Sequence, residues 1–477
     1  MTHHQESGHR LVHLDLKGAP PKVDYFEKVF PLLKSFGATG LLIEYEDMFP
    51  YWGDLEEIAC EYAYSKEAVE RIQQLAADND LIVIPLVQTF GHFEFVLKHD
   101  KFVSLREVAT FPMALCPSNP DSLTAVTMMM DQVIELHPAL QWFHIGADEV
   151  YHIGVCDKCK KRMSQENLTT QQLFFAHTQA VLLYLKAKHP NLKPIMWDDM
   201  LRFTELPVLQ GSGLGGLVEV MVWHYLTNFQ LPADIWDKFS QVFPNIWVAS
   251  AFKGATGSSV YTTNIKYHVE NHLSWLQILD KEKTKFNNFR GFAITGWQRY
   301  DHYAILCELL PQALPSLAIC LSIINKGTFS FDIHNEVSKQ LKSNCLIPIN
   351  APHLTEIPHS EFPGSDVYKA MLEFIRVDLA FDDFMNNEAR LTWMNEYHLK
   401  RNFANPVHVE PLLAQAVEIL DSLQMIYKSL QTTLSQVFYP NTVEEWLTVF
   451  PGYRIAKLSE VIDTVRNNLG HNKDMQT

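Results

Sequence analysis

Two adjacent carboxylates, Asp148 and Glu149, stand where this chain of 477 residues could carry out acid–base chemistry. They follow an apolar run at 142–145 through Gly146 and Ala147, small residues that let the backbone pass close to another group. Burying two like charges side by side is costly unless one carboxylate is protonated or both are paired. A solvated loop or a helix N-terminus would also accommodate the two acids, so the rest of the chain must decide.

Polar and aromatic residues recur at the ends of nearly all the other apolar runs. Tryptophan beside aspartate serves no purpose in core packing, whereas a sugar ring stacks on an indole and donates its hydroxyls to carboxylates. This recurrence favours a functional role for the acidic pair. The residues at these ends are Asp15, Glu44, Tyr45, Glu46, His92, Glu94, Trp197, Asp198, Asp199, Trp223, His224, Tyr225, Trp297, Arg299, Tyr300 and Asp301.

Eight short apolar runs, most of them followed by a helical pattern, must position these side chains. They lie at 11–16, 40–45, 81–87, 141–147, 194–197, 217–223, 246–251 and 291–295. Strand–helix alternation indicates parallel pairing with right-handed crossovers. We therefore predict the α/β class and a (β/α)8 TIM barrel, in which the strand ends meet at one face. An open doubly wound sheet is disfavoured, because no Gly-x-Gly-x-x-Gly turn follows the first run.

The strand–helix pattern ends near residue 330. We predict an N-terminal tail at 1–10, a catalytic barrel at 11–330, a connector at 331–365 and a C-terminal helical region at 366–477. In that region apolar residues step by three or four from Leu412 to Val437, which is typical of one long amphipathic helix. We expect this stripe to pack on the barrel rather than to form the seam of a homodimer. The proline-interrupted run at 309–324 indicates a buried helix.

Charge and cysteine content exclude several classes of partner. The net charge of −16 argues against a nucleic-acid surface and gives no reason to bind an anionic membrane. The first residues lack the apolar segment of a secretory signal, and seven cysteines in a chain of this size indicate free thiols. We therefore expect a cytoplasmic or nuclear protein. Cys156 and Cys159, with His152 nearby, have zinc-like spacing, but one pair falls short of four ligands, so no cofactor or metal is predicted.

The run His-Ile-Gly-Ala-Asp-Glu at 144–149 resembles the His-x-Gly-(Gly/Ala)-Asp-Glu signature of the β-N-acetylhexosaminidases of glycoside hydrolase family twenty. The stretches 41–47, 88–94 and 295–301 resemble the hexosaminidase D branch of that family. The likeness covers about residues 10–330 and does not reach the C-terminal helices. It implies an exo-acting hydrolase for terminal β-linked N-acetylgalactosamine or N-acetylglucosamine on glycoconjugates.

The resemblance also implies a retaining mechanism in which the 2-acetamido group of the substrate is the nucleophile and an oxazolinium is the intermediate. Glu149 would be the general acid and base, its pKa raised by apolar walls and by the charge of Asp148. Asp148 would stay ionised and orient the acetamido N–H, while Tyr225 would hold the acetamido carbonyl. The residues that would wall the pocket are Trp197, Trp223 and Trp297.

The remaining expected substrate-binding residues are Asp15, His92, His144, Asp198 and Arg299. His144 could equally be a hydrogen-bonded histidine of the barrel interior. Many family members place an arginine at the end of the first strand and a glutamate two residues after the tryptophan of the eighth. This chain has Asp15 and Arg299 instead, so we hypothesise that acid and base have exchanged sides. This exchange leaves the choice between the galactose and glucose configurations open, although hexosaminidase D-like enzymes lean towards N-acetylgalactosaminides.

Two other functions fit parts of the pattern. A metal-dependent barrel lyase could use Glu44, Asp148 and Asp198 as ligands, and its activity would not survive a chelator. A sugar-binding barrel that has lost turnover would be left unchanged by Glu149→Gln.

Overall fold

The computed structural model describes residues 8–350 and 356–474, and the chain divides into two compact units, Met1–Val337 and Ser338–Thr477. Of the predicted N-terminal tail, residues 1–7 lie outside the described ranges, while His9 and Arg10 already belong to the first strand. None of the helices in the described ranges combines the length and the apolar character that a membrane span requires.

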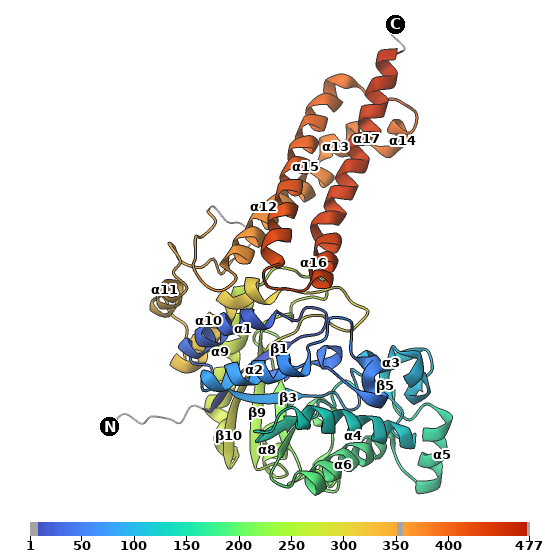
Figure 1. Ribbon diagram of the computed structural model, residues 1–477, viewed down its shortest axis with the longest axis vertical. Coiled ribbons are helices and arrows are strands. Elements are labelled where there is room, and N and C mark those ends of the chain that lie inside the picture. The colour runs from blue at the N-terminus through green and yellow to red at the C-terminus, as the bar shows by residue number, and fades with distance from the viewer. Residues whose placement is uncertain (1–7, 351–355, 475–477) are drawn as a thin grey trace. The chain divides into compact units, whose positions relative to one another are not determined.

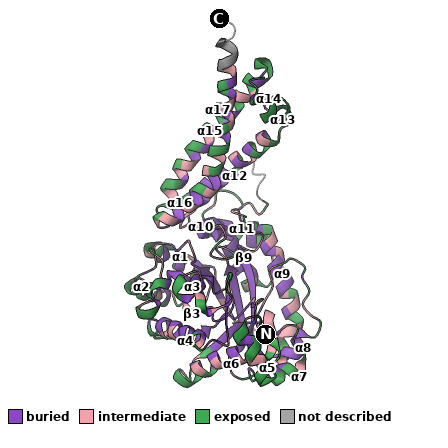
Figure 2. Ribbon diagram, turned by 90° about the vertical axis from the view of Figure 1, so that its right-hand side faces the viewer, coloured by how far each residue is buried: buried purple, intermediate pink, exposed green. Residues whose placement is uncertain are grey.

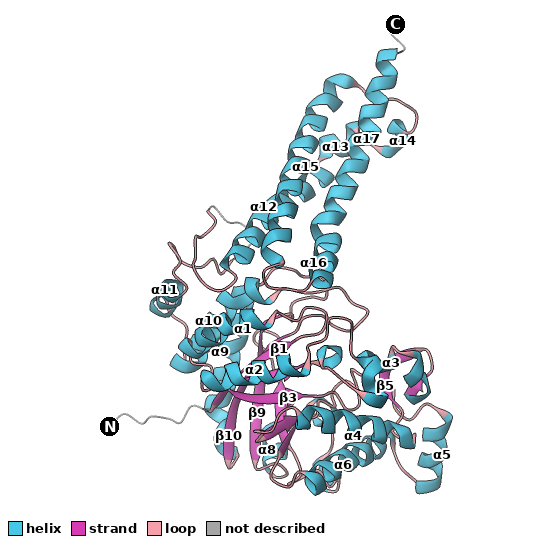
Figure 3. Ribbon diagram, viewed as in Figure 1, coloured by secondary structure: helices cyan, strands magenta, loops and turns pink. Residues whose placement is uncertain are grey.

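Eight parallel strands of the first unit close into a barrel, and helices surround it (Figures 1 and 3). The strand order around the ring is β1-β10-β9-β8-β7-β6-β3-β2, so the first and last strands pair. The predicted (β/α)8 TIM barrel is therefore confirmed, and each predicted apolar run overlaps one of its strands. The bounds are β1 His9–Asp15, β2 Gly40–Glu44, β3 Ile82–Leu86, β6 Trp142–His144, β7 Lys193–Trp197, β8 Glu219–Trp223, β9 Asn245–Lys253 and β10 Asn288–Gly296.

The strands read as continuous apolar runs because both of their faces are covered, and Figure 2 shows them buried. Large side chains such as Trp142 and Trp247 fill the barrel interior. At its amino end, the Glu219 carboxylate accepts hydrogen bonds from both indoles, at 3.2 and 2.8 Å, and pairs with Arg290 at 2.7 Å. This end is closed by a packed network, and the carboxyl end is left for the site.

Several helices of the first unit begin with a side-chain cap. Thr169 and Gln172 form a capping box on α6, and the Ser65 hydroxyl caps α2. The proline-interrupted run forms the buried helix α10, as predicted. The bounds are α1 Val23–Ser35, α2 Lys66–Asp78, α3 Glu94–Leu97, α4 Pro120–Glu135, α5 Asp157–Glu166, α6 Thr170–Lys188, α7 Leu206–Gln210, α8 Ile235–Ser240, α9 Ile265–Glu282 and α10 Leu310–Lys326, with short 3-10 turns at η1 Glu46–Met48, η2 Gly53–Ile58, η3 Asp100–Leu105, η4 Asp199–Leu201 and η5 Lys283–Lys285.

A hairpin lies between α3 and α4, where the strand–helix alternation gave no sign of further strands. β4 (Arg106–Val108) and β5 (Phe111–Leu115) pair in antiparallel fashion. The Phe93 N–H donates to the Met113 carbonyl at 2.9 Å, and the Leu115 N–H donates to the Phe90 carbonyl. These backbone bonds to a distant loop hold the hairpin, and a local sequence pattern does not reveal them.

The second unit is helical. Its long helix α15 (Pro406–Leu434) carries the predicted apolar stripe, whose buried residues include Ala416, Leu423 and Leu430. The stripe packs on α12 (Ser365–Asn386) and α17 (Tyr453–Asp474) of the same unit, and the expected packing on the barrel stays a prediction. The expected connector contains α11 (Phe331–Gln340), which lies across the boundary between the units. The remaining elements are α13 Glu388–Trp393, α14 Glu396–Leu399, α16 Pro440–Leu447 and the π-helical turn η6 Thr448–Gly452.

Candidate active site

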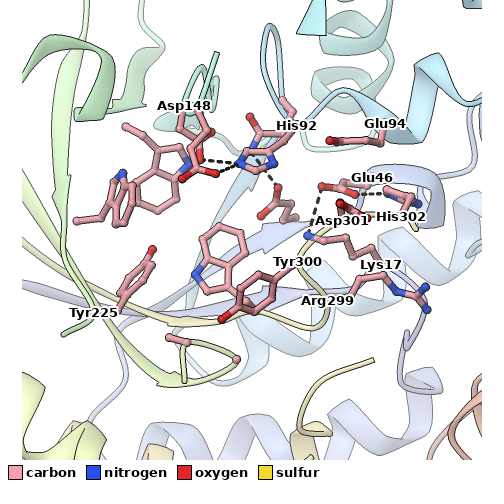
Figure 4. Close-up of a pocket in the computed structure, with 18 residues that line it drawn as sticks. Lys17, Glu46, His92, Glu94, Asp148, Tyr225, Arg299, Tyr300, Asp301 and His302 are labelled. Carbon is pink, nitrogen blue, oxygen red and sulfur yellow. Dashed lines mark hydrogen bonds and ion pairs between the residues drawn. The ribbon is translucent and has the colours of Figure 1, made fainter. Parts of the chain in front are cut away.

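A cavity of about 240 Å³ opens at the carboxyl ends of the barrel strands. Such a volume suits one sugar residue, and its walls combine aromatic faces with carboxylates and cations. Its lining residues are Lys17, Glu44, Glu46, Gln88, His92, Glu94, Asp148, Glu149, Trp197, Trp223, Tyr225, Gly254, Ala255, Trp297, Arg299, Tyr300, Asp301 and His302. Figure 4 shows Asp148 and Tyr225 at one end of it and Lys17, Glu46 and His302 at the other, with His92 between.

The two acids reach the cavity because the backbone leaves the strand conformation early. β6 ends at His144, and Gly146, Ala147 and Glu149 take φ values of 61°, 66° and 50°. Left-handed backbone at a residue other than glycine costs about 1–3 kcal/mol and persists only where the surroundings impose it. The Gly146 N–H donates to His144 Nδ1 at 3.0 Å and so supports the turn. These irregular residues bring Asp148 and Glu149 to the same cavity, which a regular strand would not do.

His92 lies between the two carboxylates. Its Nε2 is 3.1 Å from Glu149 Oε2 and 3.5 Å from Asp148 Oδ2 (Figure 4). Burial lowers the pKa of His92, but the two carboxylates outweigh it and raise that pKa to about 10. The hydrogen bond from His92 lowers the pKa of Glu149, whereas burial raises the pKa of Asp148 to about 8. Both directions oppose the sequence-based expectation, because that expectation left out the imidazolium next to Glu149.

Asp148 lines the cavity, and one of its oxygens has no hydrogen-bond partner among the described residues. Asp148 Oδ1 is buried and accepts no hydrogen bond from any residue in the described ranges, and Trp197 Nε1 donates none there. Buried polar atoms in folded proteins are nearly always hydrogen-bonded, so an acceptor and a donor left over in one cavity suggest a polar ligand. The Asp148 side chain is 7% exposed and that of Glu149 is 31% exposed, which places Glu149 nearer the opening.

Four aromatic rings form one wall of the cavity. Trp197, Trp223 and Trp297 come from the ends of β7, β8 and β10, as expected from the sequence. Tyr225 stacks on Trp223 with ring centroids 5.1 Å apart and meets Trp297 edge-on at 6.4 Å. Burial raises the pKa of Tyr225, so its hydroxyl keeps its proton and can donate it to an acceptor in the cavity.

Three residues expected to bind substrate lie behind the cavity wall. Asp15 pairs with Lys17 at 2.8 Å, and His144 packs against Trp197 with ring centroids 4.5 Å apart. Asp198 is fully buried and bonds to the Arg202 guanidinium at 2.6 and 2.8 Å. Their contacts position residues that line the cavity, and a direct contact of these three with a ligand there is not supported by their placement.

Lys17 is a cavity residue that the sequence did not single out. It lies two residues beyond the end of β1, in a stretch that reads as a turn, and its Nζ is also 3.5 Å from Glu46 Oε1. A Cβ on the next residue, Gly18, would collide with the Arg299 guanidinium. The cations of Lys17 and Arg299 therefore come from the ends of two neighbouring strands, β1 and β10. The exchange of acid and base that we hypothesised is therefore incomplete, because Lys17 keeps a base at the first strand and neutralises Asp15.

Asp199 holds the loop that carries Glu149, although it does not line the cavity. Its Oδ2 accepts the Glu149 N–H at 2.9 Å, and its Oδ1 accepts the Trp223 indole N–H at 3.2 Å. The sequence placed Asp199 at a strand end but gave no sign that it bonds to the backbone of Glu149.

The three carboxylates of the lyase alternative are engaged separately. Glu44 bonds to His13 at 3.0 Å and to Gln88 at 3.2 Å, and Asp198 bonds to Arg202. With those partners, Glu44 and Asp198 do not join Asp148 as a ligand set, so this geometry disfavours the lyase.

Known proteins resemble this chain in sequence and in fold. The profile of the glycosyl hydrolase family 20 catalytic domain matches residues 28–234. The chain is 42% identical to human hexosaminidase D over 92% of this chain and 90% of the relative. It is 48% identical to bovine hexosaminidase D, over 71% and 98% of the two chains. The β-N-acetylhexosaminidase structure from Bacteroides fragilis superimposes with a TM-score of 0.52 at 17% identity, covering 70% of each chain.

Proposed function

Because this chain belongs to the hexosaminidases of glycosyl hydrolase family 20 and is a glycosidase, we propose that it releases terminal β-linked N-acetylgalactosamine or N-acetylglucosamine from glycoconjugates. The observation that carries this proposal is Asp148 Oδ1, which is buried without a hydrogen-bond partner among the described residues, on a side chain that lines a tryptophan-lined cavity beside Glu149. A 2-acetamido N–H supplies the donor that this oxygen lacks. A cavity sized for one sugar favours removal of the terminal residue only.

In the proposed reaction the acetamido oxygen attacks C1 as the bond from C1 to the glycosidic oxygen breaks. Glu149 gives its proton to the departing oxygen, and Asp148 stabilises the positive charge of the oxazolinium through the acetamido nitrogen. Tyr225 donates a hydrogen bond to the acetamido oxygen and holds it in line. In the second step Glu149 takes a proton from water, whose oxygen opens the oxazolinium at C1 and restores the original configuration.

The protons for this reaction are held by three groups. Before substrate binds, the pKa directions put one proton on His92 and one on Asp148 and leave Glu149 ionised at neutral pH. The reaction needs the same two protons on His92 and Glu149. His92 Nε2 faces both carboxylates, so it can pass its proton to Glu149 and take the proton of Asp148. An acetamido N–H bonded to Asp148 favours its ionised form and drives this exchange.

The pH dependence tests that assignment of protons. We expect kcat/KM to fall as the pH rises through about 8, because Asp148 then loses the proton that Glu149 must receive. Steady-state rates on a glycoside with a poor leaving group measure this fall of kcat/KM with rising pH. An aryl glycoside with an acidic phenol needs little protonation of its leaving oxygen, so its kcat/KM should fall less over the same pH range. A level profile from about pH 7 to pH 9 with the poor leaving group would contradict the assignment.

Arg299 and Lys17 both line the cavity, and we assign Arg299 to the sugar hydroxyls. We expect Arg299→Ala to raise KM by about 10-fold or more, since hydrogen bonds to charged groups contribute about 1.5–3 kcal/mol. Steady-state kinetics and inhibitor binding measure the change, and Arg299→Lys is the control that keeps the charge. An unchanged KM in Arg299→Ala would show that the hydroxyls bind elsewhere.

Asp199 is expected to act by holding Glu149 in place. Asp199→Ala removes the acceptor of the Glu149 N–H and should lower kcat by about 10- to 100-fold with a small change in KM. Asp199→Asn keeps one acceptor oxygen and should lose less. If the alanine variant melts like wild type and has the full kcat, Asp199 does not hold Glu149 in place for the reaction.

The proposed activity is tested by release of the aglycone from matched β-N-acetylgalactosaminides and β-N-acetylglucosaminides. Wild-type protein should hydrolyse both classes or one of them, with the β anomer as the first product by NMR. The corresponding β-galactoside and β-glucoside, which lack the acetamido group, are the matched controls and should be inert. Turnover of these controls at similar rates, or an α anomer as first product, would overturn the proposal.

We also propose that the protein is cytoplasmic or nuclear, as expected from the sequence. None of the seven cysteines, all of which lie in the described ranges, forms a disulfide in the structure, which suits a reducing compartment.

A further inference from the structure

Three cysteines and one glutamate form a cluster outside the active-site cavity. Glu107 belongs to β4, Cys116 follows β5, and Cys156 and Cys159 lie at the start of α5 (Figure 1). One ligand atom from each of the four residues lies within 4.8 Å of the other three. The Cys116 Sγ is 3.4 Å from that of Cys156 and 3.6 Å from that of Cys159, and Glu107 Oε2 is 3.1 Å from Cys159 Sγ.

These spacings are close to the corners of a tetrahedron around one zinc ion. With zinc–sulfur bonds of about 2.3 Å, two thiolates of a tetrahedral site stand about 3.8 Å apart. Sulfur-rich tetrahedral sites with four protein ligands favour zinc and are structural, because they leave no position open for a substrate.

Glu107 supplies an independent reason for a cation. Glu107 is 2% exposed, and no lysine, arginine or histidine in the described ranges forms an ion pair with its carboxylate. Its Oε1 accepts the backbone N–H groups of Val155 and Cys156 at 2.6 and 2.9 Å, which leaves Oε2 facing the sulfurs. A buried carboxylate without a counter-charge is costly, and metal-binding carboxylates are held by such second hydrogen bonds.

Two further hydrogen bonds end on sulfur atoms of the cluster. The Cys159 N–H donates to Cys156 Sγ at 3.3 Å, so a cysteine occupies the N-cap of α5. The Ser118 hydroxyl donates to Cys159 Sγ at 3.1 Å. Cysteine is not among the preferred N-cap residues, whereas a thiolate accepts hydrogen bonds well and is favoured at a helix N-terminus. The sulfurs thus accept hydrogen bonds from backbone and hydroxyl groups, as metal-bound ligands commonly do.

We propose that Glu107, Cys116, Cys156 and Cys159 bind one structural zinc ion. The ion joins the hairpin of β4 and β5 to α5 and thereby braces the loop between Glu149 and α5. The same hairpin accepts the Phe93 N–H, next to His92, so the ion supports two of the catalytic loops. His152, the neighbour that the sequence suggested, does not belong to the set: its ring packs on Phe111 with centroids 4.9 Å apart.

The test measures the metal directly on the full chain. Protein produced with zinc in the medium should carry about one equivalent of zinc by mass spectrometry, and cobalt in its place should give thiolate-to-cobalt charge-transfer absorption. Glu107→Gln and Cys116→Ser should weaken zinc binding by more than ~100-fold in a chelator competition. Cys60→Ser, which changes a partly buried cysteine outside the cluster, is the matched control and should keep the metal.

A wild-type protein that binds neither zinc nor cobalt would overturn the proposal, whatever the variants do. A disulfide between Cys116 and either of its two neighbours in freshly purified protein would also overturn it. Because the variants can fail to fold, the chelator competition is repeated on wild type, where release of zinc should expose three additional reactive thiols and lower the melting temperature. Release of zinc without the appearance of thiols would count against these ligands.

Discussion

Glu149→Gln is expected to lower kcat/KM by about 10³-fold on a glycoside with a poor leaving group, because the amide cannot give a proton to the departing oxygen. The glutamine has the shape of the glutamate and can still accept the hydrogen bond that His92 donates at 3.1 Å. The loss should therefore lie in kcat, with a modest change in KM. Steady-state kinetics on purified variant and wild type measure it.

The leaving group provides the control for this variant. An aryl glycoside whose phenol is acidic departs with little help, so its hydrolysis should lose much less than that of an alkyl glycoside. In Glu149→Ala, azide should restore turnover by attacking C1 of the oxazolinium and giving a β-glycosyl azide. An equal loss for good and poor leaving groups would mean that Glu149 has another role.

Asp148→Asn is expected to lower kcat/KM by about 10²- to 10³-fold, the usual cost of removing one electrostatic partner of a transition state. The asparagine removes the charge that stabilises the oxazolinium, and it can turn an N–H towards the acetamido N–H. Because this contact is made mainly in the transition state, the loss should again fall on kcat.

A stable thiazoline mimic of the oxazolinium separates this effect from a folding defect. Its affinity for Asp148→Asn should fall by the same factor as kcat/KM, since both report binding of the cyclised acetamido group. The melting temperature should stay near that of wild type, because the burial of an ionisable carboxyl at this position is itself costly. Unchanged thiazoline affinity beside a large loss of kcat/KM would place Asp148 elsewhere in the reaction.

The sequence predicted the barrel and the acidic pair because both have local signals. Apolar runs alternating with helical periodicity mark the eight strands, and Asp148 and Glu149 end one of them beside glycine. Contacts between distant segments carry no such signal. The hairpin of β4 and β5 depends on backbone bonds to residues 90 and 93, and Cys116 joins Cys156 only in the folded chain.

The protonation of the site could not be read from the sequence for the same reason. Apolar walls and a neighbouring carboxylate are visible in the chain, and they suggest a raised pKa for Glu149. The position of His92, 3.1 Å from that carboxylate, reverses the direction. Lys17 was missed because a lysine between a strand and Gly18 reads as a solvated turn, yet it is buried between Asp15 and Glu46.

In the proposed mechanism the acetamido group of the substrate, and no carboxylate of the protein, attacks C1. The most direct measurement compares kcat/KM for aryl glycosides whose N-acetyl group carries zero, one, two or three fluorine atoms. Fluorine weakens the acetamido oxygen as a nucleophile, so we expect kcat/KM to decline steeply along the series, with the trifluoroacetyl glycoside nearly inert. Equal rates along the series, together with a sugar trapped covalently on Asp148 or Glu149, would contradict it.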